Sequence, residues 1–270
     1  MAQDLNQLKR QFLEYVEIEK GRSLKTVENY DHYLTIFLNQ IKIKKPEDIT
    51  DNVVREFRLW LNRQPVRKYK ARETLTRKTQ NYYLIAIRSF LKYMARQDVK
   101  TLASERIELA KVPERSLDLI NDSELDRLLK APKGEDVKAL RDKAILELLF
   151  STGLRVSELC SLPRDINLKS DELSIRGKGG KIRVVFLSDI AKQTVKVYLD
   201  KRKDMSGGLF VRIRNESNKK TKSNLAVKID NNSLDRRSIE SIVKHYATIA
   251  GISKKVTPHT MRHLFATDLL

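Results

Sequence analysis

In the first hundred residues, apolar side chains recur every three or four positions along four separate stretches. A helix turns once every 3.6 residues, so this spacing gathers the apolar side chains of each stretch on one helical face. Ser23 and Thr50 stand where they can cap the second and third helices, and Gly21 and Pro46 follow the first two stretches as breakers. The pattern therefore predicts a four-helix core made by Leu5, Leu8, Phe12 and Val16, then Tyr30, Tyr33, Phe37, Leu38 and Ile41, then Val54, Phe57, Trp60 and Leu61, and finally Tyr83, Ile87, Phe90, Leu91 and Met94.

Helical periodicity is lost between residues 98 and 119, a stretch that includes Pro113. Such a stretch is typical of an interdomain linker, and we expect one domain over residues 1–110 and another over 111–270. The second domain begins with Asn121-Asp122-Ser123-Glu124, a sequence suited to a helix capping box.

The second domain is expected to be mostly helical, with one clear interruption. Between residues 173 and 187, two β-prone runs flank Lys178-Gly179-Gly180-Lys181, which is typical of an antiparallel hairpin. The polar, lysine-rich stretch over 212–228 suits either a loop or a β insertion. The sequence thus predicts an all-α N-terminal domain followed by a mostly α domain with a small antiparallel β-sheet. Its helices are expected at 121–129, 136–151, 188–203 and 235–250, and from 258 to the last residue.

The charge of the chain points to a polyanionic partner. Lysine and arginine number 54 against 35 acidic residues, which gives a net charge of +19. An excess of this size is typical of nucleic-acid binding, the alternatives being a solubilising basic surface or, less well supported, a membrane surface. Residues 62–100 include eleven basic residues and only two acidic ones. They cover a loop and the start of a helix, where backbone N–H groups also favour phosphate. Although a charge run is often only a solvated face, we expect a surface for double-stranded DNA formed by Arg63, Arg67, Lys68, Lys70, Arg72, Arg77, Lys78 and Arg88.

The cysteine content and the N-terminus indicate a cytoplasmic location. Cys160 is the only cysteine, so no disulfide can form within the chain, which fits a reducing compartment. Cys160 is expected to be a small buried residue without a nucleophilic role. No signal peptide and no apolar run of transmembrane length occur in the sequence.

A second group of residues could bind and act on a phosphate. If Thr257 caps a helix with Pro258 at its first position, His259 and Arg262 share one face of its first turns. Arg155 follows a helix break at Gly153, and Glu158 lies one turn further on. Lys178 stands at the tip of the expected hairpin. The alternative for Arg155 and Glu158 is a structural ion pair, and for Lys178 a solubilising turn lysine.

Other kinds of site fit the sequence poorly. His259 and His263 have the spacing of zinc ligands, but Thr260 stands where a metalloprotease has its glutamate. No cysteine cluster completes a metal site, and no P-loop spacing is present, so we expect no metal and no cofactor. His263 is assigned a structural role, packing or hydrogen bonding behind the site.

Three motifs in order resemble the tyrosine recombinases, also called the phage integrase family, and most closely the Xer recombinases. The motifs are Thr152-Gly153-Leu154-Arg155-x-Ser157-Glu158-Leu159, Gly177-Lys178-Gly179-x-Lys181-x-Arg183 and Pro258-His259-x-x-Arg262-His263. The N-terminal helices are similar to the family's core-binding, SAM-like domain, through Ser23-x-x-Thr26-x-x-x-Tyr30 and Arg88-Ser89-Phe90. The resemblance covers nearly the whole chain.

The resemblance implies a site-specific recombinase that cuts and rejoins DNA through a 3′-phosphotyrosine intermediate. Arg155 and Arg262 would hold the oxygens of the scissile phosphate, supported by Glu158. Lys178 would protonate the leaving 5′-oxygen, and His259 would assist proton transfer. No cofactor is implied, and the expected partners are DNA and further recombinase subunits in a homo- or hetero-tetramer.

One part of the family pattern is not met. The family places its nucleophilic tyrosine some tens of residues beyond the last arginine motif, whereas none of the nine tyrosines follows Arg262. Tyr198 and Tyr246 are the nearest and are expected to pack within helices. We therefore expect this chain to be truncated before the nucleophile, and to bind DNA without cleaving it. The alternatives are a naturally shortened, non-catalytic DNA-binding protein and a type IB topoisomerase-like enzyme.

Overall fold

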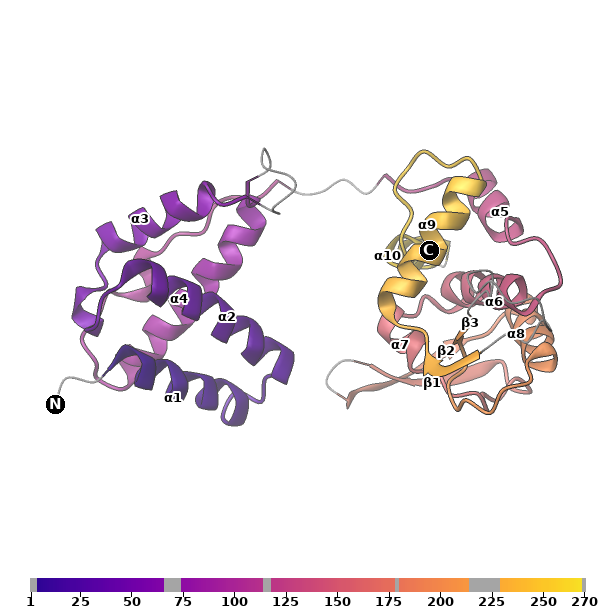
Figure 1. Ribbon diagram of the computed structural model, residues 1–270, viewed down its shortest axis with the longest axis horizontal. Helices are drawn as coiled ribbons and strands as arrows, with labels where there is room; N and C mark the ends of the chain where they lie inside the picture. The colour runs from indigo at the N-terminus through magenta and orange to yellow at the C-terminus, as the bar shows by residue number, and fades with distance from the viewer. Residues whose placement is uncertain (1–3, 66–73, 114–117, 178–179, 214–228, 269–270) are drawn as a thin grey trace, which may run out of the picture. The chain divides into compact units, whose positions relative to one another are not determined.

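The computed structural model describes residues 4–65, 74–113, 118–177, 180–213 and 229–268. Within it the chain divides into two compact units, Met1–Arg115 and Ser116–Leu270 (Figure 1). Each unit has a hydrophobic core of its own. In the described part of the chain, no helix is both long and apolar enough to cross a membrane.

The described part of the first unit is a bundle of four α-helices with two short 3-10 turns. Helix α4 contacts each of the other three helices, and several of its side chains are fully buried. Every apolar residue predicted for the four-helix core lies in that core or packs against it, so the prediction is confirmed. The elements are α1 (Leu5–Ile18), α2 (Leu24–Ile41), η1 (Pro46–Asp48), α3 (Asp51–Asn62), α4 (Arg77–Arg96) and η2 (Ser104–Arg106).

Side-chain caps fix two of these helix starts. The Thr50 hydroxyl accepts a hydrogen bond from the Val53 backbone N–H at 3.4 Å, as its sequence position predicts. Thr76 caps α4 in the same way. Ser23 occupies the N-cap position of α2, but its hydroxyl lies 3.0 Å from the Thr26 hydroxyl and caps no backbone group. The predicted Ser23 cap is therefore wrong in its contact, although the helix begins where expected.

Part of the stretch expected to be a linker belongs to the first unit. Ile107 is 1% exposed and lies in the core of the helical bundle. The Asn81 side chain donates to the Ala110 carbonyl at 2.8 Å and accepts from its N–H at 3.0 Å. Helical periodicity is absent here because the chain packs in extended form along the bundle.

The second unit is built around α6, a helix buried on nearly all sides. Figure 1 shows α6 inside a shell of helices, and it contacts α5, α8, α9, α10 and β2. The Asn121–Glu124 capping box predicted for the first helix of this unit is present. The elements are α5 (Asp122–Lys130), α6 (Val137–Thr152), α7 (Val156–Cys160), β1 (Glu172–Arg176), β2 (Ile182–Phe186), α8 (Asp189–Lys201), β3 (Val211–Ile213), β4 (Ile229–Ser233), α9 (Arg236–Ile249) and α10 (Pro258–Asp268).

A buried polar network fixes α9 against α6. Arg141 and Asp142 form an ion pair of 2.6 Å, with side chains 5% and 2% exposed. The Tyr246 hydroxyl donates to Asp142 at 3.1 Å, and Arg141 donates to the Val211 carbonyl at 3.0 Å. Because a buried charge is stable only when it is paired, this network holds α6, α9 and β3 in one arrangement.

The described strands form two antiparallel pairs. The predicted hairpin is confirmed as β1 and β2, with Glu172 opposite Phe186 and Arg176 opposite Ile182. Strands β3 and β4 form the second pair. The two alternatives for residues 212–228, a loop or a β insertion, both stay open. Residues 214–228 themselves lie outside the described part of the chain.

Candidate active site

The break between α6 and α7 places Arg155 and Glu158 side by side. Helix α6 ends at Thr152, Gly153 adopts a left-handed conformation with φ of +56°, and α7 begins at Val156. The Glu158 carboxylate accepts from the Arg155 backbone N–H at 2.8 Å and from its guanidinium at 3.1 Å. The Glu158 side chain is 6% exposed while that of Arg155 is 50% exposed. The buried carboxylate thus holds an arginine that remains open to a ligand.

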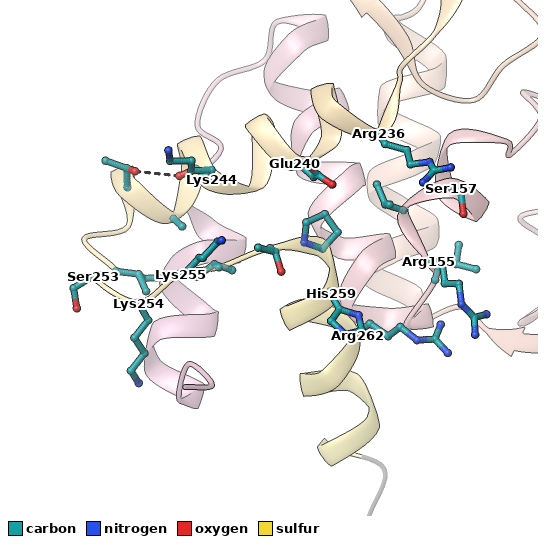
Figure 2. A pocket seen from close by; sticks show the side chains of 18 residues that line it. Arg155, Ser157, Arg236, Glu240, Lys244, Ser253, Lys254, Lys255, His259 and Arg262 are labelled. Atoms are coloured by element: carbon teal, nitrogen blue, oxygen red, sulfur yellow. Dashed lines mark hydrogen bonds between the residues drawn. The ribbon is translucent and has the colours of Figure 1, made fainter. Parts of the chain in front are cut away.

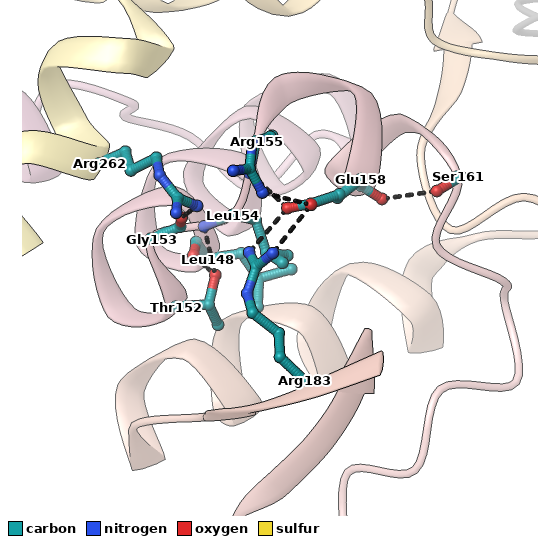
Figure 3. Close-up of polar contacts among 9 residues, drawn as sticks. All are labelled: Leu148, Thr152, Gly153, Leu154, Arg155, Glu158, Ser161, Arg183 and Arg262. Atoms are coloured by element: carbon teal, nitrogen blue, oxygen red, sulfur yellow. Dashed lines mark hydrogen bonds and ion pairs between the residues drawn. The ribbon is translucent and has the colours of Figure 1, made fainter. Parts of the chain in front are cut away.

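A second arginine, from β2, binds the same carboxylate. Arg183 donates to the two Glu158 oxygens at 2.9 and 2.8 Å, a bidentate ion pair (Figure 3). Arg183 lies in the motif Gly177-x-x-x-Lys181-x-Arg183, but sequence reasoning assigned no role to it. The signal available in the sequence was the place of Arg183 in this motif. The structure supplies the reason, because the buried Glu158 carboxylate requires charged partners.

These contacts determine the charge state of Glu158. Burial by itself would raise its pKa, but hydrogen bonds from Arg183 and from the backbone and side chain of Arg155 outweigh burial. Together they lower the pKa of Glu158 to about 2. Glu158 is therefore a carboxylate throughout the physiological range and holds both guanidinium groups in place.

We expect the second unit to lose stability in acid through Glu158. Its pKa is lower in the folded than in the unfolded chain, so its contribution is complete above about pH 4.5 and is lost as the pH falls toward 2. Glu158→Gln should remove about 3 kcal/mol of unfolding free energy at neutral pH and flatten the acid dependence. Urea unfolding followed by circular dichroism measures this, with fluorescence of Trp60, the only tryptophan, reporting the first unit.

The matched control for this variant is Glu240→Gln, which removes an exposed carboxylate on α9. That change should alter the unfolding free energy by less than about 0.5 kcal/mol. Equal stability of Glu158→Gln and the native chain at neutral pH would contradict the assigned role of the carboxylate.

Helix α10 brings a third arginine to the same place. The Thr257 hydroxyl accepts from the Thr260 N–H at 3.1 Å, so the predicted cap is confirmed, with Pro258 at the first helical position. Arg262 donates to the Gly153 carbonyl. Burial, together with the nearby charges of Arg155 and Arg183, lowers the pKa of Arg262. Three guanidinium groups from three separate elements thus lie close enough to repel one another.

The two histidines of α10 contact each other. The Nε2 atoms of His259 and His263 lie 3.1 Å apart, with ring centroids 4.4 Å apart. Burial and the neighbouring His263 and Arg262 lower the pKa of His259. A lowered pKa keeps His259 neutral near pH 7, where a neutral imidazole can accept a proton. His263, for which the sequence predicted a structural role behind the site, thus lies against a candidate site residue.

A cavity of about 960 Å³ opens beside the arginines and is lined largely by α9, α10 and the segment between them. Figure 2 shows Arg155, His259 and Arg262 at one part of its wall. Exposed basic side chains of α9 extend the wall, and Glu240 is the acidic residue of the lining. The cavity therefore offers an extended site for an anion. The additional basic residues, which the sequence did not single out, are Arg236, Lys244, Lys254 and Lys255.

Not all of the predicted site residues can be placed. Lys178 lies outside the described residues, as do Arg67, Lys68, Lys70 and Arg72. Of the other residues predicted to face DNA, Arg63, Arg77 and Lys78 are exposed and Arg88 is half-buried, all in the first unit.

One cysteine and two tyrosines, residue types that can act as nucleophiles, are unreactive in their surroundings. Cys160 is half-buried where a buried residue was expected, and burial raises the pKa of its thiol to about 11. Tyr198 is fully buried in the core, and Tyr246 is bound to Asp142. Among the described residues, no three His, Cys, Asp or Glu side chains gather into a metal-binding group.

Comparison with known proteins agrees with this geometry. Residues 119–270 match the phage integrase family, and residues 10–98 match the phage integrase N-terminal SAM-like domain. These matches confirm the fold class, a SAM-like helical domain followed by a mostly helical catalytic domain.

Similar curated proteins are Xer recombinases. The chain is 32% identical over 261 residues to tyrosine recombinase XerC of Thermodesulfovibrio yellowstonii, covering 96% of this chain and 81% of the relative. It is also 32% identical over 261 residues to tyrosine recombinase XerD of Oceanobacillus iheyensis, covering 96% and 83%. A crystal structure of a lambda integrase dimer bound to a core site shares the fold, with a TM-score of 0.67 and 16% identity over 98% of this chain and 89% of the other.

Proposed function

The chain belongs to the phage integrase family of tyrosine recombinases, with Xer recombinases as relatives, and from this we propose that its two units bind a specific site on double-stranded DNA. The observation that carries the proposal is the gathering of Arg155, Arg183 and Arg262 beside one buried carboxylate. Glu158 neutralises one charge of the three, which leaves an excess that a phosphate group would satisfy.

In this proposal Arg155 and Arg262 contact the scissile phosphate. Each of the two guanidinium groups makes only part of its five hydrogen bonds with the described residues, which leaves donors for a phosphate. Glu158 and Arg183 act as positioning residues for Arg155. Donors held in place before the reaction stabilise the charge that develops on the phosphorus oxygens in the transition state.

Proton transfer is assigned to His259 and Lys178. His259 lines the cavity beside Arg262, and its lowered pKa keeps the imidazole in the neutral form that can accept a proton. Lys178 follows Gly177 in the sequence, and a Cβ atom added at Gly177 would lie 3.4 Å from the Arg183 guanidinium and 3.5 Å from the Glu158 carboxylate. Lys178 would protonate the leaving 5′-oxygen.

We propose that these 270 residues by themselves bind DNA without cutting it. No tyrosine follows Arg262 within these residues. Of the two tyrosines nearest before it, Tyr198 is fully buried and Tyr246 is hydrogen-bonded to Asp142. On DNA the subunits would assemble as a homo- or hetero-tetramer. The basic residues predicted in the first unit, from Arg63 to Arg88, would also contact the duplex.

The proposal is tested by incubating the chain with sheared genomic DNA of its source and sequencing the bound fragments. We expect enrichment of a short site with two related, inverted halves, because paired subunits bind paired half-sites. Each sample is then denatured and divided into two halves, of which one is treated with protease. We expect the DNA to be released from the chain in the untreated half as well.

Two outcomes would contradict the proposal. Even recovery of all fragments would argue against a site-specific recombinase and favour a topoisomerase-like contact with any duplex. DNA that remains attached to the denatured chain until protease is added would show a covalent link, and the non-cleaving part of the proposal would fail.

A further inference from the structure

The contact between His259 and His263 has the geometry of a chelate. The two residues stand one turn apart on α10, and their Nε2 atoms are 3.1 Å apart. A zinc-class metal binds imidazole nitrogen at about 2.0–2.1 Å, so nitrogens at this separation subtend roughly 100° at the metal. That angle lies between the values of square-planar and tetrahedral coordination.

The surroundings allow a metal ion to reach both rings. His259 is exposed and lines the cavity of about 960 Å³, while His263 is half-buried beside it. The ordinary explanation of the 3.1 Å distance is a shared proton, with one Nε2–H donating to the other Nε2. A metal ion can take the place of that proton if both rings carry their remaining proton on Nδ1.

We propose that His259 and His263 form a two-histidine binding site for a divalent transition metal ion such as Zn²⁺, Cu²⁺ or Ni²⁺. The two Nε2 lone pairs bind the ion, and water or a small anion fills its other positions. No proton is released in this step. The ring that carried its proton on Nε2 loses it there and takes up one at Nδ1, so both rings stay neutral and both Nε2 lone pairs face the ion. The positive charges of Arg262 and of the other basic residues on the cavity wall oppose a cation here. An anion that binds among these residues and to the metal offsets that repulsion.

The consequence of metal binding rests on the proposed function. A His259 lone pair bound to a metal cannot exchange a proton, so an occupied site switches off that role of the imidazole. The binding itself does not depend on recombination and can be measured on the chain without DNA. Failure of the DNA experiment above would leave the metal site untouched, and the reverse also holds.

The test is calorimetric titration of the metal-free, folded chain with Zn²⁺, repeated with Mg²⁺. We expect one Zn²⁺ per chain and no binding of Mg²⁺, since imidazole prefers transition metals to Mg²⁺. His259→Ala and His263→Ala should each weaken Zn²⁺ binding by at least about tenfold, because each removes one arm of the chelate. His245→Ala is the matched control, since it removes a histidine of α9 that packs against Tyr246, and should bind Zn²⁺ as the native chain does.

Several results would overturn the proposal. These are the lack of saturable Zn²⁺ binding to the native chain, native affinity in either His259→Ala or His263→Ala, and loss of binding in His245→Ala. Circular dichroism of each variant checks its folding, and His259, the more exposed of the pair, provides the second reading if His263→Ala does not fold.

Discussion

Raising the salt concentration from about 50 to about 200 mM is expected to weaken duplex DNA binding by about 10³-fold or more. Each lysine or arginine that neutralises a phosphate releases a condensed counterion, and six or more such contacts give this dependence. The exposed cations on the cavity wall, the arginine cluster and the basic residues of the first unit supply at least that number. A filter-binding or anisotropy titration at several salt concentrations measures the slope.

Single substitutions distinguish a localised surface from the net charge of +19. Arg236→Ala and Lys244→Ala, on the cavity wall, should each reduce the salt slope by about one. Lys130→Ala is the matched control, because Lys130 is exposed on α5 and pairs with Asp126 at 2.7 Å. A slope near zero, or an equal effect of Lys130→Ala and Lys244→Ala, would contradict a DNA surface at the cavity.

The features that the sequence predicted are those determined by local periodicity and by short motifs. The four helices of the first unit were predictable because each buries one face, as in Leu5, Leu8, Phe12 and Val16. The capping box at Asn121 and the cap at Thr257 were predictable because a cap depends on residues three positions apart.

The features that were missed depend on contacts distant in the sequence. Arg183 meets Glu158 across 25 positions, and Arg262 meets Gly153 across 109. Ile107 is buried by an extended segment, which has no helical period to detect. The order of the motifs placed Arg155 and Arg262, the arginines proposed to bind phosphate, in one site only by resemblance. The fold explains how they meet, at the break after α6.

That break leads to the second large effect, which we expect from Gly153→Ala. Gly153 has φ of +56°, a conformation that strains any residue with a Cβ atom. A Cβ atom there would also lie 2.3 Å from Cδ1 of Phe265 on α10. The two effects together should lower the unfolding free energy of the second unit by roughly 4 kcal/mol. Urea unfolding followed by circular dichroism measures this loss.

A matched glycine separates the strain from the clash. Gly251 has φ of +67° in the same unit, and a Cβ atom there would meet nothing within 4 Å. Gly251→Ala should therefore lower the unfolding free energy by only about 1–2 kcal/mol. Adding Phe265→Ala to Gly153→Ala should relieve the clash, with a coupling energy of about 2 kcal/mol. Equal losses for the two glycine variants would show that α10 does not pack on the break between α6 and α7. The conclusion that this packing brings Arg262 of α10 close to Arg155 would then be wrong.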